Sequence, residues 1–284
     1  MQTIVTAGGV RLHTHEWLPS NALAQAQGTV LVVHGLSEHA GRYAHVAAAL
    51  NDAGWRVVGY DHRGHGRSQG PRGGISAPHS LLADLGCVLD AARAAPGHAP
   101  AGLLVLLGDS MGGVVAGRYV AEALAAAPAA WSRPVDRLVL ASPALTVDMT
   151  PFQKLLLAVL GPLAPNFAVR TGLDLGNLSH DPAVAETYRA DPLVHEMITA
   201  RLTRFIMDGA AETLAAAPRW RVPTLLMWGS ADRIVPPAGS RTFAATAPAS
   251  VVTAHEYPGL YHELFNEVQR ADVLARLTGW LADR

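Results

Sequence analysis

A serine with glycine two positions before and two positions after it is the first group in the sequence that could do chemistry. Residues 108–112 have the sequence GDSMG and follow the apolar run 103–107. The pattern G-x-S-x-G between a buried strand and a helix is typical of the nucleophile elbow, a sharp turn that exposes a reactive serine. Glycines are needed there because the turn brings strand and helix close together. Ser110 is therefore the candidate nucleophile; the alternative is that it only caps the following helix.

Two later segments could supply a base and a group that orients it, which a serine hydroxyl needs in order to react at neutral pH. Asp232 follows the apolar run 224–228, and His262 follows the run 251–257. The chain order Ser, Asp, His is that of α/β-hydrolases and differs from that of chymotrypsin or subtilisin. We predict that His262 accepts the hydroxyl proton and that Asp232 orients the imidazole. The alternatives are a turn-forming role for Asp232 and a polar position at a helix N-terminus for His262.

Two backbone amides are candidates for an oxyanion hole, which would stabilise the tetrahedral intermediate of acyl transfer. One belongs to Met111, directly after the nucleophile, and the other is expected in the loop after the third strand. That loop is the segment 34–39, HGLSEH, and we assign the second donor to Leu36. Gly35 gives the chain the freedom to turn this N–H inward. His34 is expected to support the loop.

The elements that must position these groups are indicated by continuous apolar runs alternating with helical patterns. Such runs favour strands buried on both faces of a parallel sheet. The runs are 29–33, 55–60, 103–107, 138–141, 224–228 and 251–257, and the helical patterns are 42–53, 79–94, 111–126, 237–247 and 264–282. The alternating stretch 10–18 predicts an antiparallel strand at one edge. The fold class is therefore α/β, a doubly wound and mostly parallel sheet of about eight strands.

One long segment interrupts this alternation. Residues 144–220 contain no buried-strand run and are helical and punctuated by prolines. We predict that they form a helical cap, inserted into a core made of residues 1–143 and 221–284. Because the insertion leaves after one strand and returns before the next, it should lie over the carboxyl ends of the strands, where ligands bind in open α/β sheets.

An apolar stripe at helical spacing lies within the predicted cap. Its members are Phe152, Leu155, Leu156, Val159, Leu160 and Leu163. Of these, our candidates for substrate contact are Phe152, Leu156, Val159 and Leu160. The alternative is that the stripe is the core of the cap. As the lining of an acyl tunnel, or as a surface touching a lipid interface, it implies an ester with a medium or long acyl chain and a small polar alcohol.

Composition excludes several classes of partner. The net charge is −1 and half of the residues are hydrophobic, so no field of one sign exists to recruit nucleic acid or an anionic membrane. The single cysteine, Cys87, allows no internal disulfide, and nothing nearby in sequence would activate it as a nucleophile.

Arg11 and Glu16 interrupt the early apolar positions, which argues against a signal peptide. The apolar run 155–169 is broken by a glycine and two prolines and is too short to span a bilayer. We therefore expect a cytoplasmic protein that contacts membranes only peripherally, through the cap.

No cofactor or metal is predicted. The pair His13 and His15 lacks an H-E-x-x-H motif or a clustered Asp/His pattern. The segment 61–68, DHRGHGRS, is rich in cations, but its glycines favour a tight loop in which Asp61 and Arg63 bond to the backbone.

The motifs together resemble the monoacylglycerol lipase and lysophospholipase group of α/β-hydrolases, within the serine aminopeptidase S33 type. The similarity spans nearly the whole chain. The matching segments are HGLSEH with GRY at 34–43, DHRGHGRS at 61–68, GDSMG at 108–112, the residues 229–235, HELFNE at 262–267 and, in the cap, LSHDP at 178–182 and DPLV at 191–194. One position departs from the pattern, since the group usually has glycine where this chain has Ser37.

The resemblance implies a serine esterase with Ser110, Asp232 and His262 as its triad and with glycerol as the alcohol of its lipid-like ester substrate. A general carboxylesterase and a lysophospholipase remain alternatives, as do a proline iminopeptidase and a receptor that keeps the fold without catalysis. An aminopeptidase would need acidic residues that converge on the substrate ammonium; the candidates in the cap are Glu186, Glu196 and Asp208.

Overall fold

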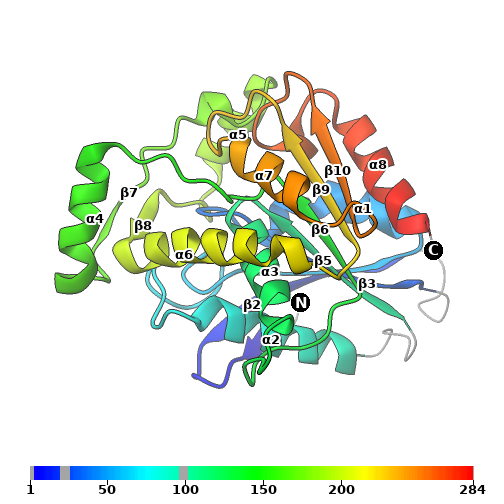
Figure 1. Cartoon of the computed structure of the whole chain (residues 1–284), viewed down its shortest axis with the longest axis horizontal. Helices are drawn as coiled ribbons and strands as arrows, with labels where there is room; N and C mark the ends of the chain where they lie inside the picture. Colours follow the sequence, from blue (N-terminus) through cyan, green and yellow to red (C-terminus); the bar gives the residue numbers. More distant parts are fainter. Residues whose placement is uncertain (1–2, 20–25, 96–101, 284) are drawn as a thin grey trace.

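A central sheet of eight strands organises the molecule (Figure 1). It belongs to a computed structural model that describes residues 3–19, 26–95 and 102–283, apart from the side chain of Leu160. The strand order is β1-β2-β4-β3-β5-β6-β9-β10. The strands are β1 (Thr3–Val5), β2 (Arg11–Trp17), β3 (Gly28–Val33), β4 (Arg56–Tyr60), β5 (Leu103–Asp109), β6 (Arg137–Ala141), β9 (Thr224–Gly229) and β10 (Val252–Tyr257).

The sheet confirms the predicted fold class. The six strands from β4 to β10 are parallel to one another, and every residue of β3, β4 and β9 is buried. The alternating stretch 10–18 forms β2, which pairs antiparallel with β4. The outermost strand is β1, which was not predicted because three largely exposed residues carry no periodic signal.

Helices cover both faces of the sheet. On one face, α1 (Ala44–Asp52) and α8 (Arg270–Ala282) pack against alternate strand residues such as Val30 and Val32. On the other face lie α2 (Ser80–Ala94), α3 (Met111–Ala123) and α7 (Ala238–Thr246), whose buried residues belong to one apolar cluster with Leu31 and Val33. Period-two burial on both faces of one strand explains why these runs are apolar throughout.

The last helix begins later than predicted. Residues Leu264–Asn266 form a short 3-10 helix, Glu267 has extended backbone, and α8 starts only at Arg270. The Glu267 carboxylate is fully buried and accepts hydrogen bonds from the backbone amides of Tyr261 and His180. Because these bonds hold the Glu267 side chain in the interior, with its backbone extended, the first helical turn ends there and the helix does not continue.

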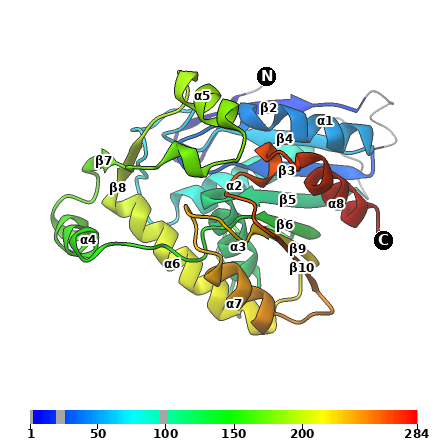
Figure 2. The same cartoon turned by 90° about the horizontal axis from the view of Figure 1, so that it is seen from above.

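The segment between β6 and β9 is mainly helical, as expected of a cap. It contains α4 (Pro151–Leu163), α5 (Pro182–Ala190), α6 (Ala200–Ala216) and 3-10 turns at Leu175–Asn177 and Ala217–Arg219. It also contains two short strands that were not predicted, β7 (Ala168–Arg170) and β8 (Met197–Thr199), which pair antiparallel and are only partly buried. Seen from above, α4 lies beyond one end of the sheet (Figure 2).

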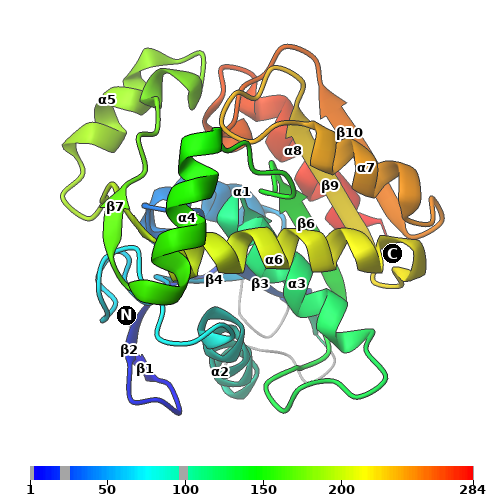
Figure 3. The ribbon, with the colours of Figure 1, turned by 60° about the vertical axis from the view of Figure 1, so that its left-hand side comes forward.

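The helix α6 joins this segment to the main core. It passes across α3 (Figure 3), and its buried residues Leu202, Phe205 and Ile206 belong to the same apolar cluster as the sheet. At the crossing, a Cβ on Gly117 would lie 2.9 Å from the Thr213 side chain, so glycine permits the close approach. Within the described ranges, no helix combines the length and the apolar character that a membrane span requires.

Candidate active site

The nucleophile elbow is built by the junction of β5 and α3. Ser110 lies between them with a φ of 52° and a ψ of −118°, a strained conformation for a residue with a side chain. A Cβ on Gly112 would lie 1.9 Å from the carbonyl oxygen of Val33, and one on Gly108 would lie 2.5 Å from the carbonyl oxygen of Gly112. Both glycines are therefore required by the close approach of β5, β3 and α3.

The three predicted triad side chains meet at the carboxyl edge of the sheet. The Ser110 hydroxyl lies 2.9 Å from Nε2 of His262, and Nδ1 of His262 lies 2.7 Å from Oδ2 of Asp232. The second oxygen of Asp232 accepts hydrogen bonds from the backbone amides of Ile234 and Val235, each at 2.9 Å. The carboxylate is thus fixed before it orients the imidazole.

The environment of His262 favours a base that can hold a proton. Burial by itself disfavours the charged imidazolium, but the charge and hydrogen bond of Asp232 outweigh burial and raise the pKa of His262 above its usual range. A proton taken from the serine would therefore be held on a stabilised imidazolium until a leaving group accepts it.

The two predicted oxyanion donors border the same cavity as Ser110. Leu36 and Met111 both line it, and within the described residues neither amide donates a hydrogen bond to another group. The loop that carries Leu36 is held by Glu38, which accepts a hydrogen bond of 2.7 Å from the Gly35 amide. Ser37 has a φ of 72°, so the loop keeps the left-handed conformation for which glycine is the usual residue.

A partly buried arginine links the loop of Leu36 to the loop of His262. The Arg42 guanidinium donates to both oxygens of Glu263, at 2.9 and 2.8 Å, and also to Glu38. Glu263 directly follows His262 in the chain. The sequence analysis placed Arg42 in a matching motif but did not find this contact, because nothing in the local spacing pairs residues so far apart.

A second buried contact fixes the protonation of the residue before the nucleophile. The Tyr43 hydroxyl lies 2.7 Å from a carboxyl oxygen of Glu38 and 2.7 Å from one of Asp109. A phenol carries one proton and can donate to only one of them. Glu38 also accepts from Arg42 and Gly35, so Asp109 is the carboxyl group of this pair with fewer donors. Burial, together with the charge of Glu38, raises the pKa of Asp109 to about 7.

A cavity of about 190 Å³ opens above Ser110. Its walls are largely apolar. The cap and the loop after β9 contribute Leu173, Leu178, Ile198, Ile206, Ile234 and Val235 to its lining. An apolar cavity with a few convergent polar groups at its base is typical of a small-molecule site.

The predicted substrate stripe does not line this cavity. Phe152 and Val159 are exposed, at 70% and 47%, and Leu156 is half-buried outside the lining. The side chain of Leu160 lies outside the described part of the chain. The interpretation of these residues as tunnel lining was therefore wrong for Phe152, Leu156 and Val159. Helical periodicity identified an apolar face but not the neighbour that it faces.

The cation-rich segment 61–68 is a structural loop. Asp61 accepts hydrogen bonds from the backbone amides of Ala40 and Arg67, as expected. Arg63 bonds not to backbone but to the buried carboxylate of Asp84, with both contacts at 2.6 Å. Cys87 is half-buried on α2, and it does not line the cavity.

His13 and His15 have a carboxylate beside them, although no clustered Asp/His pattern accompanies them in the local sequence. The pairing of β2 with β4 brings Asp61 to the two histidines. Possible ligand atoms of these three residues lie within 4.8 Å of one another.

A parallel sheet that presents a serine on a strained turn at its carboxyl edge, beneath an inserted cap, defines the α/β-hydrolase class. Comparison with known proteins narrows this class: residues 24–269 match the model of the serine aminopeptidase S33 family, and the chain belongs to that family.

Several relatives with curated names are monoacylglycerol lipases. The chain is 36% identical over 277 residues to a monoacylglycerol lipase of Mycolicibacterium smegmatis, covering 96% of this chain and 94% of the relative. It is 30% identical over 286 residues to the human monoglyceride lipase, covering 99% and 90%. The crystal structure of Paleococcus ferrophilus monoacylglycerol lipase superposes with a TM-score of 0.82 at 30% identity, covering 95% and 98%.

Proposed function

We propose that the protein hydrolyses monoacylglycerols to a fatty acid and glycerol through an acyl-enzyme on Ser110. The observation that carries the proposal is the continuous hydrogen-bonded chain from Asp232 through His262 to Ser110 at the base of an apolar cavity. The names of the relatives support the choice of substrate.

Acylation begins when His262 accepts the proton of the Ser110 hydroxyl and the oxygen attacks the ester carbonyl. The carbonyl oxygen becomes an anion, which the amides of Leu36 and Met111 stabilise. Collapse of this intermediate breaks the bond between the carbonyl carbon and the glycerol oxygen. The His262 imidazolium gives its proton to that oxygen, and glycerol leaves.

Deacylation repeats these steps with water. His262, again neutral, accepts a proton from the attacking water molecule, and the same two amides stabilise the second anion. The bond to the Ser110 oxygen then breaks, and the imidazolium returns the proton to the serine. Fatty acid is released and the enzyme is restored.

The cavity favours an ester over an aminopeptidase substrate. Its lining is largely apolar, and each methylene of an acyl chain buried there contributes about 0.8 kcal/mol of binding. The cap carboxylates named as candidates for holding a substrate ammonium, Glu186, Glu196 and Asp208, do not line it, although Asp148 of the cap does. Glu196 instead bonds to Arg170 on the surface.

The exposed face of α4 supports a contact with lipid interfaces. Phe152, Leu155, Val159 and Leu163 are exposed along one side of the helix, and Phe167 follows beyond its end. Exposed apolar side chains on an amphipathic helix insert into membrane or micelle surfaces. We expect the purified protein to bind neutral phosphatidylcholine vesicles, and the double variant Phe152→Ser/Leu163→Ser to bind them at least about tenfold more weakly. Equal binding by both proteins would contradict this role.

The test of the function combines labelling with a substrate panel. Wild-type protein should react with a fluorophosphonate probe and hydrolyse monoacylglycerols faster than p-nitrophenyl esters, lysophospholipids or prolyl amides. Ser110→Ala should do neither. Labelling without monoacylglycerol hydrolysis would refute the substrate, and hydrolysis by Ser110→Ala would refute the mechanism.

A further inference from the structure

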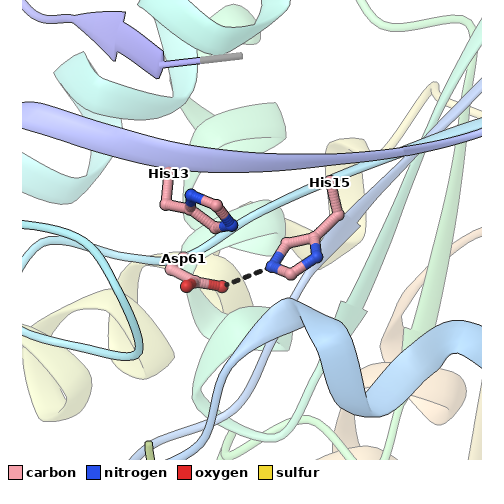
Figure 4. A group of neighbouring side chains, drawn as sticks. All are labelled: His13, His15 and Asp61. Atoms are coloured by element: carbon pink, nitrogen blue, oxygen red, sulfur yellow. Dashed lines mark hydrogen bonds and ion pairs between the residues drawn. The ribbon is translucent and has the colours of Figure 1, made fainter. Parts of the chain in front are cut away.

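Three side chains at the junction of β2 and β4 form a group that the proposed reaction does not use. His13 and His15 are two residues apart on β2 and therefore project from the same face of the strand. Asp61 directly follows β4, and its backbone amide donates a hydrogen bond of 2.9 Å to the carbonyl of His13. Both imidazole rings point toward the Asp61 carboxylate (Figure 4).

The separations within this group suit a shared ion. Nε2 of His15 lies 3.2 Å from Oδ1 of Asp61. One possible ligand atom from each of the three residues lies within 4.8 Å of those from the other two. Nε2 of His13 is buried and has no hydrogen-bond partner among the described residues. A buried imidazole nitrogen without a partner is costly, which calls for a group that binds it.

We propose that His13, His15 and Asp61 bind a divalent transition-metal ion, with Zn²⁺ as the best match. Two imidazole nitrogens and one carboxylate oxygen are a ligand set that Zn²⁺ accepts, with water in the fourth position. Ligand atoms about 2.0–2.1 Å from a tetrahedral ion lie roughly 3.4 Å apart. The His15–Asp61 pair already has this spacing, and the remaining separations need to shorten by on the order of 1 Å.

Surrounding contacts would orient the ligands. The backbone amides of Ala40 and Arg67 donate to the two oxygens of Asp61, at 3.0 and 2.8 Å, and such outer contacts hold metal-binding carboxylates in place. On the other side, the His15 ring stacks on Trp17, with centroids 5.5 Å apart. When the ion binds, it replaces the proton between His15 and Asp61, and the His15 ring carries its proton on Nδ1. The positive charge of Arg67 opposes the ion and limits its affinity.

The site is separate from the candidate active site and does not rest on the proposed function. Three strand spacings, from β2 through β4 and β3 to β5, separate it from the strand of Ser110 by roughly 14 Å. An ion there would tie β2 to the loop after β4 without touching the reacting groups.

The test is Zn²⁺ titration of the untagged protein by calorimetry at pH 7.5, with the folding of each variant checked by circular dichroism. We expect one site per chain, weakened at least about tenfold in His13→Ala and His15→Ala and unchanged in the control His79→Ala, whose histidine is exposed at the start of α2. Co²⁺ should give the visible absorption of a four-coordinate ion in wild type but not in His13→Ala.

Three results would overturn the proposal. The first is an absence of Zn²⁺ binding by the wild type. The second is binding of equal strength in His13→Ala and His15→Ala. The third is binding that is lost in His262→Ala but kept in His13→Ala, which would place the ion at the triad. Because His13 Nε2 makes no hydrogen bond in the described structure, His13→Ala should fold even if His15→Ala does not.

Discussion

The single proton of Tyr43 leads to a quantitative prediction about Asp109. Tyr43 can donate its proton to only one of Glu38 and Asp109, and Asp109, which is buried beside the charge of Glu38, has a pKa raised to about 7. Asparagine has the same shape, carries no charge and can donate to the Tyr43 oxygen. We therefore expect Asp109→Asn to fold, and to gain stability relative to wild type as the pH rises.

The magnitude follows from the pKa of the group in the two states. The pKa of Asp109 is raised to about 7 in the folded protein, by burial and by the charge of Glu38, whereas an unfolded aspartate has a pKa of about 3.9. The folded state binds the proton more tightly, so stability is greatest below the unfolded pKa and is lost as the pH rises toward the folded one. Between pH 5 and pH 8 this loss amounts to about 2–3 kcal/mol.

Urea unfolding at pH 5, 6, 7 and 8 measures the effect. The free energy of unfolding of Asp109→Asn minus that of wild type should increase by about 2–3 kcal/mol over this range. Asp208→Asn, which removes an exposed carboxylate of α6, is the matched control and should show almost no pH-dependent difference. If the difference in free energy of unfolding between Asp109→Asn and wild type stayed constant with pH, the raised pKa of Asp109 would be refuted.

Three further predictions concern the triad and its turns. Asp232→Asn should lower kcat by about 10⁴-fold, and the acid limb of its residual pH–rate profile should move to lower pH, because Asp232 no longer raises the pKa of His262; an unmoved limb in steady-state assays would contradict the pairing. Ser37→Gly should raise the free energy of unfolding by about 0.5–1 kcal/mol, since the φ of 72° suits glycine; urea unfolding would disprove this if the variant were less stable. Gly112→Ala should lose at least about 3 kcal/mol, because its Cβ would lie 1.9 Å from the Val33 carbonyl oxygen; a soluble, fully active variant in thermal and ester assays would show that the elbow can relax.

The sequence predicted the parts of the fold that depend on local pattern. Strands buried on both faces produce continuous apolar runs, and all six such runs form strands. Ser110, Asp232 and His262 each follow one of these strands, so their shared location at the carboxyl edge of the sheet was predictable from parallel order. The tests described above address their catalytic roles.

Contacts between distant segments carry no such local signal. The pairing of Asp61 with His13 and His15 depends on β2 lying beside β4, which strand patterns alone do not determine. The buried anchor Glu267 ends a turn that helical periodicity predicts to continue. The orientation of α4 was missed because an apolar face has the same spacing whether it packs on protein or remains exposed.

The ion pair of Arg42 with Glu263 also bears on when, during synthesis of the chain, the candidate active site can first be complete. Glu263 is 221 residues further along the chain than Arg42, and a ribosome adding about 5–20 residues per second needs roughly 10–45 s to reach it. Throughout that interval Arg42 has only Glu38 as its ionic partner, and the imidazole of His262 is absent. By the proposed mechanism, the nascent polypeptide gains esterase activity only after the segment that carries His262 and Glu263 has been synthesised and has folded.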